Sequence, residues 1–185
     1  MVYYYSHLFS IQNILLGIIF YIILFFIYNS GLNKISDPTF RKYYKRNFNL
    51  KVVLVTVYAF YYTFVVGGGD TVAYWEGAVR LNNLFWKSPV MYFEELLNTP
   101  TFEMQWRHFD SQTGFPPGWI YREPESWFIS KIYSLIAFVS FKSYLVGSVF
   151  SAFIMSKASW RLFLLVDSFK LHQTKHIAFA VLFLP

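Results

Sequence analysis

An uninterrupted apolar run from Ile14 to Tyr28 is the feature that most constrains how this chain folds. It lies inside a longer apolar segment, residues 8–28. About 20 helical residues, each rising 1.5 Å, cover the roughly 30 Å of a bilayer's hydrocarbon core. No basic region precedes the run, and no small-residue cleavage site follows it. The segment is therefore predicted to be a membrane-spanning helix that is retained as an anchor.

Composition and charge also indicate a membrane protein. Hydrophobic residues make up 56% of the chain and charged residues 14%, whereas soluble domains carry roughly 25% charged residues. The net charge of +6 is sorted along the chain: residues 29–51 hold six Lys or Arg and one acid, and residues 67–127 hold eight acids and four Lys or Arg. Such sorting is typical of a membrane topology, so no nucleic-acid partner is expected.

The basic segment is expected to be cytoplasmic by the positive-inside rule, which places the N-terminus outside. Further spans are predicted at residues 50–66 and 144–166, with an outer loop over residues 67–125. Residues 126–141 are expected to form an interfacial or re-entrant helix, because later basic residues would lie outside if that helix crossed. The predicted fold is an all-α, polytopic integral membrane helix bundle forming a single membrane domain, 1–185.

The last apolar run, from about residue 176, is too short to span a bilayer. We therefore expect the chain to be the N-terminal part of a longer protein. The cysteine count is zero, so neither disulfides nor thiolate metal sites are expected. The histidines are scattered, and no metal site is predicted from them.

The outer loop is predicted to carry short helices lying on the membrane surface. One covers residues 70–86, with Asp70 able to cap it. Another begins at Pro89 after a Ser88 cap. Residues 98–124 are expected to be irregular because of their glycines and prolines. The apolar face of the first helix is predicted to hold Val72, Trp75, Val79 and Trp86.

Asp70 is the first candidate for chemistry, since it follows Gly67-Gly68-Gly69 at the predicted outer boundary. Its carboxylate can act as a general base, hold a substrate hydroxyl or join a cation site. The glycines let a phosphate or sugar approach the backbone closely, at the start of a helix that favours anions. The alternative is that Asp70 only caps the helix while the glycines turn the chain. The sequence favours neither.

Tyr74 and Trp75 follow Asp70 closely. Tyr74 shares a helical face with Asp70, and both aromatic rings can stack on a sugar. An interfacial aromatic belt explains them as well, and is favoured by how common aromatic residues are here. Glu76 and Arg80 are predicted to form an exposed ion pair one helical turn apart.

A second candidate cluster occupies the segment "REPESWFISK". Arg122 can bind a phosphate through two hydrogen bonds, with Glu123 beside it. Glu123 can instead cap a helix whose first residue is Pro124. Lys131 lies on an otherwise apolar helix, where it must either extend to the interface or meet an anion such as a lipid phosphate. Extension to the interface is favoured.

The segments "GGGDTVAYWEGA" and "REPESWFISKIYSLIAFVSFKSYLVGSVFSAF" resemble the N-terminal part of EpsG-like and Wzy-like polysaccharide polymerases. These polymerases are themselves loosely similar to the wider lipid-linked, GT-C-type glycosyltransferases. The likeness covers residues 52–166. The resemblance places Asp70, Tyr74, Glu123, Pro124 and Lys131 at matching positions. The family's later arginine-bearing outer loop has no counterpart before Pro185.

The resemblance implies glycan transfer between undecaprenyl-diphosphate carriers at the outer face of the bacterial inner membrane, without a cofactor. Asp70 would be the base or would position the acceptor, while Arg122 and Lys131 would contact phosphate. Tyr74, Trp75 and Glu123 would bind substrate. The implied partners are a lipid-linked oligosaccharide, membrane lipids and other polysaccharide-export components.

Two non-enzymatic alternatives stay open. The chain can belong to a transport or assembly subunit that binds a glycolipid or partner through its outer loop. It can also be a purely structural subunit whose outer loop is a docking surface. Transport is less favoured, because the interiors of the first two predicted spans hold no ionisable residue.

Overall fold

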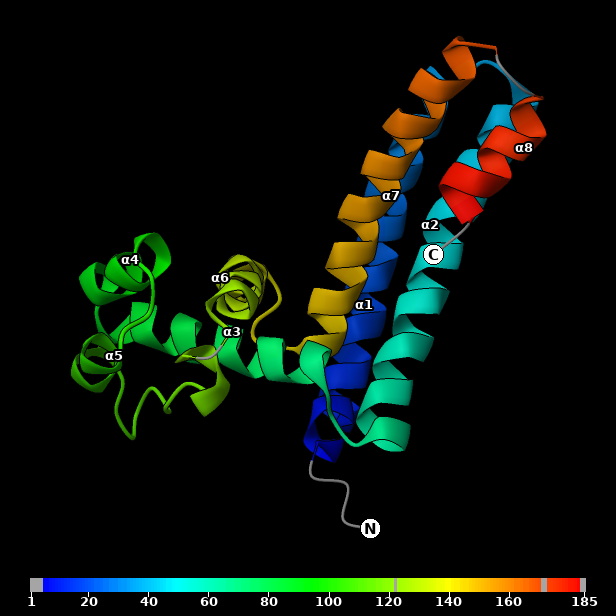
Figure 1. The fold of residues 1–185 in the computed structure, drawn as a ribbon. Coiled ribbons are helices and arrows are strands. Elements are labelled where there is room, and N and C mark those ends of the chain that lie inside the picture. Colours follow the sequence, from blue (N-terminus) through cyan, green and yellow to red (C-terminus); the bar gives the residue numbers. More distant parts are fainter. Residues whose placement is uncertain (1–4, 122, 171–172, 184–185) are drawn as a thin grey trace.

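The computed structural model describes residues 5–121, 123–170 and 173–183, and every regular element in these ranges is helical. Figure 1 shows two parts that meet at an angle: a bundle of long helices, and a lobe of shorter helices that leaves the bundle sideways. The prediction of an all-α fold is confirmed.

The bundle is built from three long helices: α1 (Ile11–Asn29), α2 (Pro38–Tyr61) and α7 (Tyr144–Ser168). A 3-10 turn, Ser6–Phe9, precedes α1; another, Ser30–Lys34, follows it; and a π-helical turn, Tyr62–Val66, extends α2. With these turns included, three helical segments are long and apolar enough to cross a membrane: Ile11–Lys34, Pro38–Val66 and Tyr144–Ser168. The second and third contain the spans predicted at residues 50–66 and 144–166, and the first overlaps the span predicted at residues 8–28 but begins at Ile11.

The second of these helices begins well before residue 50, where the span was expected to start. Asp37 Oδ1 accepts hydrogen bonds from the amides of Thr39 (2.7 Å) and Phe40 (2.9 Å), and Pro38 is the first helical residue. A capping carboxylate followed by proline is a strong helix start. The basic residues expected in a loop therefore lie in the first half of α2, except Lys34, which ends the preceding 3-10 turn.

The lobe contains α3 (Asp70–Lys87), α4 (Pro89–Leu97), α5 (Phe102–His108), a 3-10 turn (Gly118–Tyr121) and α6 (Pro124–Val139). The expectation that residues 98–124 are irregular is wrong in part, because α5 and the 3-10 turn lie there. Thr101 begins α5 by accepting a hydrogen bond from the Met104 amide at 3.2 Å. Figure 1 shows α6 nearly end-on, across the axis of the bundle. The interfacial or re-entrant position expected for residues 126–141 stays a prediction.

Three glycines connect the bundle to the lobe. Gly67, Gly68 and Gly69 have φ angles of 79°, 129° and 97°, a region that other residues rarely adopt. Gly69, rather than Asp70, is the N-cap of α3, and it provides no side-chain cap. The expected capping role of Asp70 is therefore wrong: Asp70 is the first residue inside the helix.

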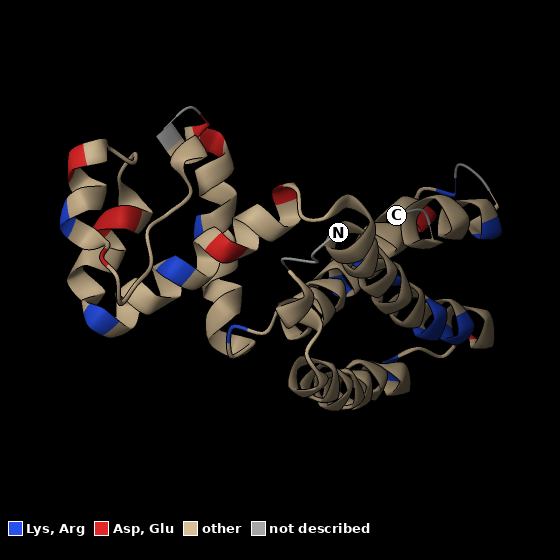
Figure 2. Cartoon of the chain, turned by 90° about the horizontal axis from the view of Figure 1, so that it is seen from below, with Lys and Arg blue, Asp and Glu red and all other residues tan. Residues whose placement is uncertain are grey.

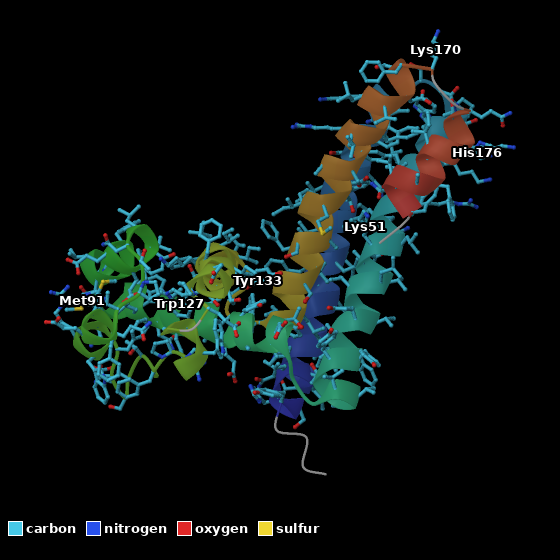
Figure 3. The ribbon with its side chains drawn as sticks, in the orientation of Figure 1. Lys51, Met91, Trp127, Tyr133, Lys170 and His176 are labelled. Carbon is cyan, nitrogen blue, oxygen red and sulfur yellow. The ribbon has the colours of Figure 1, made fainter. Side chains whose placement is uncertain are left out.

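Two further glycines let α3 pack closely on its neighbours. A Cβ at Gly77 would lie 2.8 Å from the Trp127 ring, and a Cβ at Gly147 would lie 2.6 Å from the Trp75 ring. Trp127 is completely buried inside the lobe (Figure 3). The predicted apolar face of α3 holds in part, since Val72 and Trp75 are buried while Trp86 is 70% exposed.

The chain then turns back along the bundle. Helix α8 (Thr174–Ala178) and a π-helical turn (Phe179–Phe183) lie beside α2 in Figure 1. Their buried residues Ile177, Ala178 and Leu182 join the core formed by α1, α2 and α7. The apolar run predicted from residue 176 is thus a short helix packed against the bundle.

Candidate functional site

Three predicted site residues lie where α3 and α6 begin. Tyr74 donates from its hydroxyl to Ser126 Oγ at 3.4 Å, and Ser126 Oγ donates to Glu123 Oε2, also at 3.4 Å. Asp70 lies one turn before Tyr74 and is exposed. Its carboxylate makes no hydrogen bond or ion pair with the described part of the chain, although it interacts electrostatically with Tyr58. Tyr74 and Glu123 therefore lie at one corner of the lobe, where α3 and α6 meet, while Asp70 lies at the start of α3, near Tyr58 of α2.

Trp75 faces the interior instead. It is buried to 4% exposure, its ring packs on Gly147, and the rings of Tyr133 and Tyr144 lie 6.4 and 5.8 Å away. A sugar cannot stack on a ring face that is already covered. This placement favours a packing role between α3, α6 and α7.

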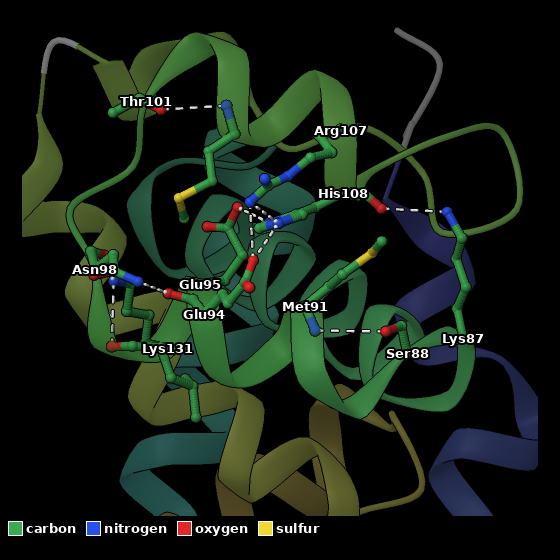
Figure 4. Close-up of polar contacts among 12 residues, drawn as sticks. Lys87, Ser88, Met91, Glu94, Glu95, Asn98, Thr101, Arg107, His108 and Lys131 are labelled. Carbon is green, nitrogen blue, oxygen red and sulfur yellow. Dashed lines mark hydrogen bonds and ion pairs between the residues drawn. The ribbon is translucent and has the colours of Figure 1, made fainter.

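Lys131 is buried and already engaged. Its ammonium donates to the carbonyls of Asn98 (2.6 Å) and Leu96 (3.4 Å) at the C-terminal end of α4, as Figure 4 shows for Asn98. Burial lowers the pKa of Lys131, and the nearby carboxylate of Glu95 raises it. A cation at the C-terminus of a helix is favoured by the helix dipole. The arrangement therefore favours a structural role over contact with a phosphate.

The remaining predicted residues are Arg122, Glu123 and the pair Glu76 and Arg80. Arg122 lies outside the described residues. Glu123 is the N-cap of α6, followed by Pro124, as expected, although its side chain makes no capping hydrogen bond. The predicted ion pair of Glu76 with Arg80 is confirmed, with 3.6 Å between the charged atoms.

The lobe also holds a buried polar cluster that was not predicted from the sequence. His108 Nδ1 lies 2.9 Å from Glu95 Oε1, and both side chains are completely buried. His108 Nε2 lies 2.9 Å from Glu94 Oε2, which also pairs with Arg107 at 3.0 Å (Figure 4). Burial raises the pKa of Glu95, while His108 and then Lys131 lower it.

This cluster joins α4 to α5. Both ring nitrogens of His108 face carboxylates, so neither is free for another partner. In the described ranges, no group of three or more His, Asp or Glu residues could hold a metal ion. The signal in the sequence was the adjacent pair Glu94-Glu95 on a predicted helix. It was overlooked because the segment carrying His108 was expected to be irregular.

An apolar groove runs along the bundle between α2 and α7. It has a volume of about 580 Å³, and its lining, apart from Lys51, is almost entirely hydrocarbon and aromatic: Leu54, Val55, Val57, Tyr58, Tyr61, Ala152 and Met155. Figure 3 shows Lys51 on α2, away from the lobe. Val55 and Tyr58 also line a second cavity of about 130 Å³ between α2, α3, α6 and α7. This smaller cavity is rich in hydroxyl groups, from Tyr58, Thr71, Tyr133, Tyr144, Ser148 and Ser151.

A polar groove of about 460 Å³ lies between the start of the chain, α3 and the loop of residues 111–114. Arg80 and Lys142 line it, and Lys142 donates to Asn83 Oδ1 at 2.6 Å. The adjoining turn is held by Asp110, which accepts from Lys87 at 2.9 Å. The Lys87 hydrogen bond and the Thr113 amide lower the pKa of Asp110 to about 2.

The fold defines the class of protein only broadly: three long apolar helices indicate a multi-pass membrane protein. Comparison with protein-family models, curated proteins and solved structures finds no match. Function must therefore be argued from the groove, the cavity and the residues beside them.

Proposed function

We propose that the chain belongs to a membrane glycosyltransferase of the polysaccharide-polymerase type. It would act at the outer face of the bacterial cytoplasmic membrane on glycans carried by undecaprenyl diphosphate. The observation that carries this proposal is that the apolar groove between α2 and α7 shares two lining residues, Val55 and Tyr58, with a hydroxyl-lined cavity that Thr71, next to Asp70, also lines. The resemblance of "GGGDTVAYWEGA" to the polymerase family agrees with it.

The apolar groove suits a prenyl chain. Its wall offers hydrocarbon and aromatic side chains from two helices that could each span the membrane. A polyprenyl lipid in the bilayer would lie along such a wall without exposing apolar surface to water. Tyr58 marks the point where the apolar lining gives way to hydroxyl groups. A lipid lying in the groove would therefore bring its polar head to the lobe.

Asp70 is the proposed general base. Its carboxylate is exposed beside the residues that close the cavity, and no cation among the described residues neutralises it. In the proposed reaction, Asp70 takes the proton of an acceptor hydroxyl. The hydroxyl oxygen then bonds to the anomeric carbon of the donor sugar, and the bond from that carbon to the diphosphate oxygen breaks. The electron pair leaves with the lipid diphosphate, and a cation is needed to stabilise it. Arg122 is proposed for that role.

Tyr74 and Glu123 are proposed to hold the acceptor glycan. The hydrogen bonds through Ser126 fix the orientation of both side chains. A phenol hydroxyl and a carboxylate are suited to sugar hydroxyls, which donate and accept hydrogen bonds. Trp119, with its ring centre 5.7 Å from that of Tyr74, adds an aromatic surface at the same corner.

The proposal is tested by Asp70→Asn, introduced into the gene in cells whose surface polysaccharide depends on it. Asparagine keeps the size of the side chain but is not a base. We expect polymer to fall by about a hundredfold or more, within the range typical of a lost general base, while unpolymerised lipid-linked repeat units accumulate. Glu103→Gln, an exposed carboxylate on α5, is the matched control and should leave polymer unchanged. Normal polymer with Asp70→Asn would contradict the catalytic assignment.

One observation favours the alternative of a non-enzymatic, glycolipid-binding assembly subunit. Among the residues described, no cation lines the hydroxyl-rich cavity. Purified protein incubated with lipid-linked glycan extracted from the source cells separates the two proposals. Extension of the glycan supports the transferase. Binding without any extension, by the wild-type protein and by Asp70→Asn alike, supports the assembly subunit.

A further inference from the structure

A basic groove lies at the end of the bundle opposite the lobe. It occupies about 560 Å³ between the end of α1, the start of α2 and the second half of α7. Its lining residues are Gly31, Lys34, Ile35, Ser36, Asp37, Phe40, Tyr44, Lys157, Trp160, Arg161 and Leu164. Three of these are cations and one is an acid. In Figure 1 the end of α1 and the start of α2 lie at the opposite end of the bundle from the start of α3.

The single acid does not neutralise the three cations. The carboxylate of Asp37 is engaged by the amides of Thr39 and Phe40, where it caps α2. Arg161 and Lys34 lie close enough to the ammonium of Lys157 to repel it electrostatically. An anion placed among the three side chains would relieve this repulsion.

The floor of the groove is rigid. Lys157 donates to the Tyr44 hydroxyl at 2.6 Å, and its ammonium lies 4.5 Å from the centre of the Tyr28 ring. The Tyr28 and Tyr44 rings stack with centres 4.1 Å apart, and the Tyr44 hydroxyl donates to the Tyr28 carbonyl at 3.0 Å. A Cβ at Gly31 would lie 2.6 Å from that hydroxyl, so only glycine allows this approach. Lys157 is thus held in place before any ligand arrives.

We propose that this groove binds a phosphate group carried by an anionic lipid of the cytoplasmic leaflet. Most of the charged residues of the bundle are Lys or Arg, whereas most of the Asp and Glu residues lie in the lobe (Figure 2). The positive-inside rule therefore puts the groove on the cytoplasmic side. It lies where α1 ends, at the depth of lipid headgroups. Arg161 supplies a planar donor for phosphate oxygens, and Lys34 and Lys157 supply point charges.

The test uses purified protein in nanodiscs of phosphatidylcholine alone, or with 30 mol% phosphatidylglycerol as the anionic probe, followed by native mass spectrometry of the lipids retained. The variant is Lys34→Gln/Arg161→Gln, which changes two exposed residues and leaves the Lys157 floor intact. The control is Lys42→Gln/Lys45→Gln, which removes two exposed charges from the same end of α2 without touching the groove. Inorganic phosphate, added separately, is the soluble probe.

We expect the wild-type protein to retain phosphatidylglycerol in preference to phosphatidylcholine. The groove variant should lose about tenfold or more of this preference, because Lys34 and Arg161 line the groove and would make charge-assisted contacts to the bound phosphate, which exposed charges outside the groove do not make. The control should stay within about twofold of the wild type. If millimolar inorganic phosphate displaced the retained phosphatidylglycerol, the groove would still be a phosphate site, but its assignment to a lipid would be overturned in favour of a soluble ligand. Equal retention by the wild-type protein and the groove variant, or equal loss in the control, would overturn the proposal.

Discussion

His108 and Glu95 form a completely buried pair, with 2.9 Å between Nδ1 and Oε1. They lie 13 positions apart in the sequence, and the pair fixes α5 against α4. Trp127, which is also completely buried, lies near the Glu95 carboxyl. The lobe is therefore organised around a polar centre as well as an apolar core.

Removing one partner of this pair should destabilise the lobe. His108→Ala leaves the Glu95 carboxyl buried without its nearest partner, and breaking a buried pair in this way costs about 3–5 kcal/mol. Chemical denaturation in detergent, followed by tryptophan fluorescence, measures the loss. Glu103→Gln on the exposed face of α5 is the control and should stay within about 0.5 kcal/mol of the wild type. A His108→Ala variant as stable as this control would refute the structural role.

The stability of the lobe should also depend on pH through Glu95. Its pKa is raised above the ordinary value of 4.5, so the folded chain binds this proton more tightly than the unfolded chain does. The contribution of Glu95 to the free energy of unfolding is therefore largest at low pH. It is lost as pH rises from about 4.5 through the raised value. Denaturation of the wild type and of Glu95→Gln across this window measures the difference. A gap between the two curves that does not change with pH would contradict the prediction.

Gly77→Ala should separate α3 from α6. The added Cβ would lie 2.8 Å from the buried Trp127 ring and 2.7 Å from Ser130 Oγ. Overpacking of this kind costs about 1–3 kcal/mol, and the better helix propensity of alanine returns at most about 1 kcal/mol. Thermal unfolding should show a lower midpoint. Gly118→Ala, which meets no atom within 4 Å, is the control. Equal midpoints for the two variants would show that the helices are not tightly packed at Gly77.

Lys131→Met should reduce stability and leave substrate binding intact. Methionine keeps the apolar stem but leaves the carbonyls of Asn98 and Leu96 without their donor. We expect a loss of about 1–3 kcal/mol, measured by denaturation as above. Binding of extracted lipid-linked glycan, measured at a temperature where the variant is folded, should match that of the wild type. If the variant kept its stability but lost binding, the result would contradict the structural role and support the phosphate contact expected for Lys131 from the sequence.

The three long helices were predictable, because they depend on local apolar runs. Helix α4 was predicted with its exact cap, since Ser88-Pro89 is a local signal. The start of α2 was not predicted, because its first turns are basic and show no apolar run, although Asp37-Pro38 is a local helix-start signal. At α3, Asp70 is a good N-cap by type, yet Gly69 takes that position because the backbone there needs a positive φ.

The site was less predictable, because it depends on which helices meet. Tyr74 and Glu123 are far apart in the sequence, and only the crossing of α3 and α6 brings them to one serine. Trp75 and Lys131 are residue types that often bind ligands. In the structure, however, the Trp75 ring packs on Gly147 and the Lys131 ammonium donates to the Asn98 carbonyl at the end of α4. No local pattern records such contacts.

The most direct test of the account is the side of the membrane on which the lobe lies. The 185 residues contain no cysteine, so Ser111→Cys in the lobe and Thr39→Cys at the basic end of the bundle each introduce a single thiol into them, and the unsubstituted protein is the labelling control. A membrane-impermeant maleimide added to intact cells should label Ser111→Cys, and should label Thr39→Cys only after permeabilisation. Labelling of Thr39→Cys in intact cells, with Ser111→Cys protected until permeabilisation, would contradict an outer-face site.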